Sequence, residues 1–111
     1  MKRSGLAKPL EGGLEHVQAL LPVEVLTEDP AAWRAPSAAE IRVVIGKDSE
    51  TGLPGAQAAH LVGVLPQNFR KYTAADDAAS RQKMSFAMWH LLLHRTGVKL
   101  VSVVEIDAKK T

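Results

Sequence analysis

The sequence predicts a small, mostly α-helical protein in which a compact bundle of four to five helices is followed by one C-terminal β-strand. Three observations support this prediction. Apolar residues recur every three or four positions along much of residues 13–97, the spacing of one face of a helix. Glycine and proline residues divide this region into short segments, as helix ends do. After Gly97 the pattern changes to an alternation of β-branched and other residues, which is typical of a strand.

The composition sets limits on the class of protein. A chain of 111 residues is the size of one domain, and 46% hydrophobic residues are enough for a packed core. The absence of cysteine excludes disulfides and cysteine-based zinc sites and favours a cytoplasmic location. No apolar run reaches about 18 residues, so we expect no membrane span. No apolar stretch follows Lys2 and Arg3, so we expect no signal peptide.

Residues 1–36 are predicted to form an N-terminal arm and leader. A short helix is expected over residues 13–21, where Pro22 would end it. The following segment, VEVL at 23–26, fits a short strand or a helix end equally well. Trp33 is expected to anchor this leader onto the core, because a large aromatic side chain gains most from burial.

Residues 37–97 are predicted to form the main domain. Its first helix begins at Ser37, with Glu40 three residues later as in a capping box, and ends near Gly46. Its last helix begins at Ser85 and stops at Gly97. The side chains expected to face the core from these two helices are Ile41, Val44, Ile45, Met88, Trp89, Leu92 and Leu93.

Between them, two short helices are predicted over residues 54–62 and 66–73, joined by a sharp turn. Ala59 is small enough for a second helix to cross the first closely there. Gly63 suits the left-handed backbone of the turn, and Val64 is expected to lie beneath it. These features are those of a helix-turn-helix motif.

The second of these helices has two predicted faces. Phe69 and Tyr72, three positions apart, are expected to pack inward. The remaining positions carry side chains suited to base edges and phosphates in a major groove, namely Gln67, Asn68, Arg70 and Lys71. The surrounding charge fits this prediction, since residues 60–99 hold six basic and two acidic residues. Arg81 and Lys83 are expected to hold phosphates beside the helix.

Residues 37–97 resemble the phage-repressor-like (Cro/C1-type) helix-turn-helix regulators of plasmids, phages and integrative elements. The segments that carry the resemblance are AAHLVGVLPQNFRKYT and MSFAMWHLLLHRTG, separated by a polar loop. The family's structural positions fall on Ala59, Gly63, Val64, Phe69 and Tyr72, and its DNA-facing positions on Gln67, Asn68, Arg70 and Lys71.

This sequence departs from the family's pattern at two places. Where the family has glutamine at the start of the first motif helix, this chain has Gly55, or Gln57 shifted by two positions. Where the family has a serine or threonine cap before the recognition helix, this chain has Leu65. The resemblance implies a homodimeric bacterial repressor that binds double-stranded DNA and lies at the nucleoid when bound, with no catalysis and no cofactor.

Residues 98–111 are predicted to form a strand and tail that make the dimer. The strand, at 99–106, needs a partner for its backbone groups. That partner is either residues 23–26 of the same chain or the same strand of a second subunit, which would place two recognition helices on paired half-sites.

Other residues support alternatives. His90 and His94 have a zinc-binding spacing, but no third ligand is evident and we expect them to border the core. Lys2, Arg3 and Lys8 fit a minor-groove arm or an ordinary terminus. The alternative function is a protein-interaction module, such as an antitoxin-like or anti-activator subunit, on the same scaffold.

Overall fold

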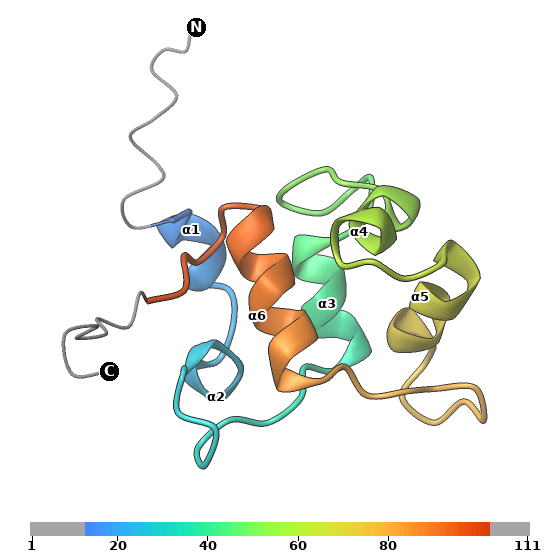
Figure 1. Ribbon diagram of the computed structural model, residues 1–111, viewed down its shortest axis with the longest axis horizontal. Helices are drawn as coiled ribbons and strands as arrows, with labels where there is room; N and C mark the ends of the chain where they lie inside the picture. Colours follow the sequence, from blue (N-terminus) through green and yellow to red (C-terminus); the bar gives the residue numbers. More distant parts are fainter. Residues whose placement is uncertain (1–12, 103–111) are drawn as a thin grey trace, which may run out of the picture.

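The computed structural model describes residues 13–102, which contain six helices and no β-strand. The helices are α1 (Glu15–Gln18), α2 (Val23–Leu26), α3 (Ala38–Val44), α4 (Gly55–Leu61), α5 (Pro66–Thr73) and α6 (Phe86–Arg95). In Figure 1, α6 lies at the centre beside α3, with α4 and α5 on one side and α1 and α2 on the other. The mostly α-helical class predicted from the sequence is therefore confirmed. None of these helices is long and apolar enough to cross a membrane.

The core is built around α6. Trp89, Leu92 and Leu93 on this helix are completely buried, as the helical spacing predicted. Every other helix adds at least one buried side chain to the same cluster, which includes Val17, Val25, Ile41, Val44, Ala58, Ala59 and Phe69. The cluster is continuous across the predicted boundaries at residues 36 and 97, so the leader from residue 13 onward packs as part of the domain.

The Val25 carbonyl is one of the groups through which the leader is attached to α6. The oxygen of Val25 accepts hydrogen bonds from the indole nitrogens of Trp89, at 2.8 Å, and Trp33, at 3.2 Å. The Trp33 ring also packs edge-on against Phe86, with 5.3 Å between the ring centroids. These contacts confirm the predicted anchoring role of Trp33. Residues 23–26, for which the sequence left a strand and a helix end open, form the short helix α2.

The first predicted helix is shorter than the 13–21 expected. α1 ends at Gln18, and Leu20 is half exposed. Pro22 has no N–H to donate to the Gln18 carbonyl four residues earlier, and that carbonyl accepts instead from the Leu21 backbone amide at 3.1 Å, in a tighter turn. Leu21 is nonetheless buried.

The start of α3 has the predicted capping box. The Ser37 hydroxyl accepts from the Glu40 amide at 3.2 Å, and the Glu40 carboxylate accepts from the Ser37 amide at 2.8 Å. Glu40 also receives two hydrogen bonds from the Arg34 guanidinium, at 2.9 and 2.8 Å. The carboxylate therefore joins the leader to the first helix of the predicted main domain.

We expect Glu40 to make the fold sensitive to acid. Hydrogen bonds from Arg34 lower the pKa of Glu40 below its ordinary value of 4.5, against an opposing effect of burial. A lowered folded pKa stabilises the protein above pH 4.5, and this contribution is lost as the pH falls through the folded pKa. Glu40→Gln should therefore cost about 1 kcal/mol at pH 7 in urea unfolding, and less at pH 3. Asp48→Asn, in an exposed loop, is the control, and a cost independent of pH would contradict the prediction.

The predicted C-terminal strand at 99–106 is wrong for the residues that the structure describes. Residues 99–102 are not in a strand, and 103–106 lie outside the described part of the chain. Side chains of the same chain bind this segment instead. Glu28 pairs with the Lys99 ammonium at 2.6 Å and accepts from the Ser102 amide at 3.3 Å, and the His94 ring accepts from the Val101 amide at 3.1 Å. Residues 23–26, which the sequence suggested as the intrachain partner of this strand, form the helix α2. A helical backbone offers no edge with which a strand could pair.

Candidate nucleic-acid interface

The turn between α4 and α5 has the predicted geometry. Gly63 adopts a left-handed backbone with φ of +78°, and the Val64 amide donates back to the Ala59 carbonyl at 3.0 Å. Ala59 is completely buried. Leu65 precedes α5 without a side-chain cap, and Pro66 occupies the first turn, where its missing N–H costs nothing. Both helices of the motif begin and end within one residue of the predicted positions.

The two faces of α5 are also as predicted. Phe69 is only 2% exposed and Tyr72 is partly buried, with 5.9 Å between their ring centroids. The α5 polar face, defined as Gln67, Asn68, Arg70 and Lys71, is exposed throughout. One side of the helix is therefore held by aromatic packing, while four polar or basic side chains extend into solvent.

The C-terminal end of α5 is held by hydrogen bonds from outside the helix. The Lys71 carbonyl accepts from the backbone amide of Gln82 at 2.9 Å, and the Tyr72 carbonyl accepts from the Arg81 guanidinium. The Thr73 carbonyl accepts from the Arg42 guanidinium at 2.8 Å. Cationic donors are favourable at this end because the last carbonyls of a helix carry partial negative charge. We call this set of donors the C-terminal clamp.

Arg81 was predicted to hold a DNA phosphate, but its guanidinium is directed toward groups of the protein itself. Its side chain is only 10% exposed. Besides Tyr72, its guanidinium donates to the Pro36 carbonyl at 2.9 Å and lies 3.5 Å from the Asp76 carboxylate. The group joins the end of α5 to Pro36, which precedes the Ser37 cap of α3. Sequence reasoning missed Arg42, because nothing local marks a bond between residues 31 positions apart.

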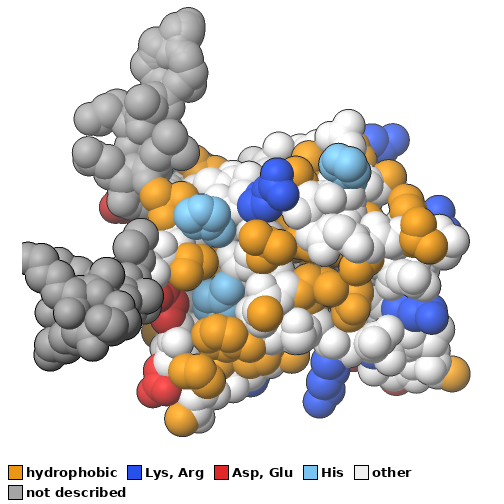
Figure 2. Space-filling model, viewed as in Figure 1, with side chains coloured by type: hydrophobic (Ala, Val, Ile, Leu, Met, Phe, Trp, Pro, Cys, Tyr) orange, Lys and Arg blue, Asp and Glu red, His pale blue; other side chains and the backbone are white. Residues whose placement is uncertain are grey.

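The other predicted contacts, Gln57 and Lys83, are exposed. Leu65 adds an exposed apolar side chain, 58% accessible, at the start of α5. In Figure 2, lysine and arginine side chains appear toward the side that carries α4 and α5, while acidic side chains show mainly toward the opposite side. The predicted arm residues Lys2, Arg3 and Lys8 lie outside the described residues.

The histidine pair does not converge on a metal position. Both ring nitrogens of His90 lie 2.9 Å from carbonyl oxygens, those of Phe86 and Thr27. The Nδ1 atom of His94 accepts from the Val101 amide. Within residues 13–102, no group of three or more potential ligand side chains gathers for a metal ion.

We expect Ala59 to tolerate no larger side chain. Ala59→Leu would place additional carbon atoms in a fully buried position at the turn between α4 and α5. Overpacking of this kind should lower the free energy of unfolding by about 1–3 kcal/mol. Ala56→Leu, exposed on the same helix, is the matched control for urea unfolding. Equal stability of the two variants would mean that the helix crossing does not depend on a small residue at 59.

Comparison with models of known protein families found no match to this chain, and comparison with curated protein sequences found none either.

Proposed function

We propose that this protein is a sequence-specific DNA-binding regulator that places α5 in the major groove. The α5 polar face is the observation that supports this function most directly. Four adjacent polar or basic side chains are exposed on a helix whose opposite side is held by Phe69 and Tyr72. A major groove admits one α-helix, and such side chains match the donors and acceptors of base edges.

The four side chains have distinct roles in this proposal. Gln67 and Asn68 carry amides that can bind adenine through two hydrogen bonds. Lys71 reads a base, while Arg70 binds the phosphate backbone. Leu65, exposed before the helix, suits contact with a thymine methyl group. Lys83 and Gln57 contact phosphates at the flanks, whereas Arg81 holds α5 through the C-terminal clamp.

The regulator acts as a homodimeric repressor in this proposal. A helix of eight residues contacts only a few base pairs, and symmetric dimers on two half-sites are the usual solution. The described residues 99–102 form no strand to join two copies, so the dimer contact is not assigned to that segment. Light scattering of the full chain, alone and with DNA, tests the stoichiometry.

Removal of the basic side chains on α5 tests the function. Arg70→Ala and Lys71→Ala should each weaken binding to a selected site by about tenfold or more, while urea unfolding stays close to that of the wild type. Arg70→Ala should also lower the salt slope of binding by about one, because one phosphate contact is lost. Lys47→Ala, an exposed lysine outside α5, is the control.

The site itself is obtained by selecting genomic fragments that bind the wild-type protein at about 100 mM salt, where non-specific binding is reduced. Unchanged DNA affinity in both α5 variants would contradict this assignment. That result would favour the protein-interaction alternative, in which the same helices hold a protein partner.

A further inference from the structure

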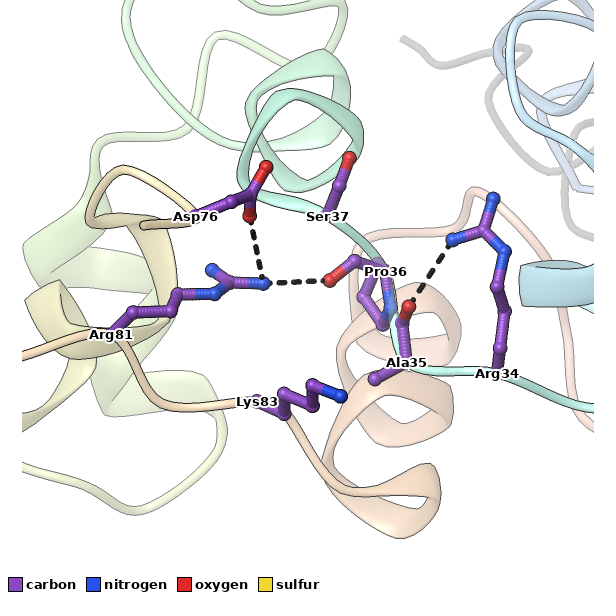
Figure 3. A pocket seen from close by; sticks show the side chains of 7 residues that line it. All are labelled: Arg34, Ala35, Pro36, Ser37, Asp76, Arg81 and Lys83. Carbon is purple, nitrogen blue, oxygen red and sulfur yellow. Dashed lines mark hydrogen bonds and ion pairs between the residues drawn. The ribbon is translucent and has the colours of Figure 1, made fainter. Parts of the chain in front are cut away.

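A hollow lies between the segment before α3 and the connection that follows α5 (Figure 3). Its volume is about 520 Å³, within the range of sites that hold small molecules. The lining residues are Arg34, Ala35, Pro36, Ser37, Asp76, Arg81 and Lys83. None of the residues that form the α5 polar face lines it.

Positive charge exceeds negative charge in this hollow. Arg34 is neutralised by Glu40, at 2.8 Å, and Arg81 shares the Asp76 carboxylate with the Ala38 amide, which donates to it at 3.1 Å. Among the described residues, no acidic side chain forms an ion pair with Lys83. Its side chain extends toward Ala35 and Pro36 in Figure 3. The positive charge of Lys83, which no acidic side chain of the described residues balances, therefore lies at the hollow.

Arg81 connects this hollow to α5. One guanidinium nitrogen lies at the hollow, between the Pro36 carbonyl and Asp76 (Figure 3). The other donates to the Tyr72 carbonyl near the end of α5. Two of these three acceptors are neutral carbonyls. A guanidinium binds a carboxylate or phosphate about twice as strongly as a neutral acceptor, and often through two parallel hydrogen bonds. An anion beside Lys83 would therefore compete with the carbonyls for Arg81.

We propose that the hollow binds a small soluble ligand through its phosphate or carboxylate group, between the Lys83 ammonium and the Arg81 guanidinium. Binding draws the guanidinium away from the Tyr72 carbonyl and loosens the C-terminal clamp. If α5 reads DNA, as proposed above, the ligand weakens specific DNA binding. This regulatory step rests on the proposed function, whereas the binding of the anion does not.

The test uses the full chain without DNA and inorganic phosphate as the probe. Phosphate replaces chloride at constant ionic strength while backbone amide shifts are followed by NMR. Saturable shifts are expected at Ser37 and Lys83 and also at Tyr72 and Thr73. Lys83→Ala should raise the dissociation constant about tenfold, because a charged hydrogen bond is lost. Lys47→Ala should leave it unchanged. No saturable shift around the hollow, or equal affinity in Lys83→Ala, would overturn the proposal.

Arg81→Lys separates binding from coupling. A lysine keeps the positive charge but cannot donate to Tyr72 and to the anion from one planar group. Phosphate should still shift Ser37 and Lys83 in this variant, but no longer Tyr72 and Thr73. Equal shifts at α5 in Arg81→Lys and the wild type would overturn the coupling.

A phosphate group of the DNA backbone could occupy the hollow in place of a soluble anion. If the hollow holds a soluble anion, the free protein should bind phosphate saturably, and Lys83→Ala should weaken that binding whether or not the variant also weakens DNA binding. A salt slope of DNA binding lowered by about one in Lys83→Ala, together with no phosphate binding by the free wild-type protein, would assign the hollow to the DNA backbone and overturn the proposal. A protein that binds phosphate at the hollow but no DNA would contradict the proposed function alone.

Discussion

Trp89→Ala is expected to lower the free energy of unfolding by about 3–5 kcal/mol, a large share of the roughly 5–15 kcal/mol that stabilises a domain. Trp89 is completely buried in the centre of α6, and α6 is the helix around which the core is built. Its removal would leave a cavity between the leader and the main domain. Thermal and urea unfolding, followed by circular dichroism, measure the loss.

Trp89→Phe keeps the test informative if Trp89→Ala fails to fold. Phenylalanine fills most of the same volume but cannot donate to the Val25 carbonyl. That oxygen keeps the hydrogen bond from Trp33, so the net cost of the lost bond should be near 1 kcal/mol, in addition to the lost volume. A Trp89→Ala protein no less stable than Trp89→Phe would contradict the central place of this side chain in the core.

The elements that the sequence predicted correctly are those with local causes. Ser37 and Ser85 cap the helices that follow them, and Gly63 and Gly97 end helices in left-handed conformations. Each of these effects depends on atoms only a few residues apart, so the pattern alone contains the information. The α5 polar face was predictable for the same reason, because helical spacing decides which side chains share a side.

The errors occurred where distant residues decide the outcome. The alternation at 99–102 favoured a strand, but these residues bind Glu28 and His94, which lie far away or on another element. Tertiary contacts often override such a propensity. The role of Arg81 depends on carbonyls at Pro36 and Tyr72, and no local pattern marks that geometry. The hollow was missed for the same reason, since its lining comes from two separate segments.

Phe69→Ala is the second variant for which we expect a large effect. Phe69 is the only residue of α5 in the fully buried part of the core, so this short helix depends on it for attachment. The variant should lose about 3–5 kcal/mol of unfolding free energy. If α5 reads DNA as proposed, specific DNA binding should be lost as well. The hydrogen bonds of the C-terminal clamp remain but hold only the end of the helix.

Hydrogen exchange shows where the Phe69→Ala variant is weakened. If Phe69 attaches α5 in particular, the amides of α5 should lose protection before those of α6, since local opening requires less free energy than global unfolding. Phe69→Leu, which retains an apolar side chain, should lose less stability and keep partial protection of α5. Uniform loss of protection in α5 and α6 would mean that Phe69 supports the whole core, and that α5 has no separate attachment for a regulatory ligand to loosen.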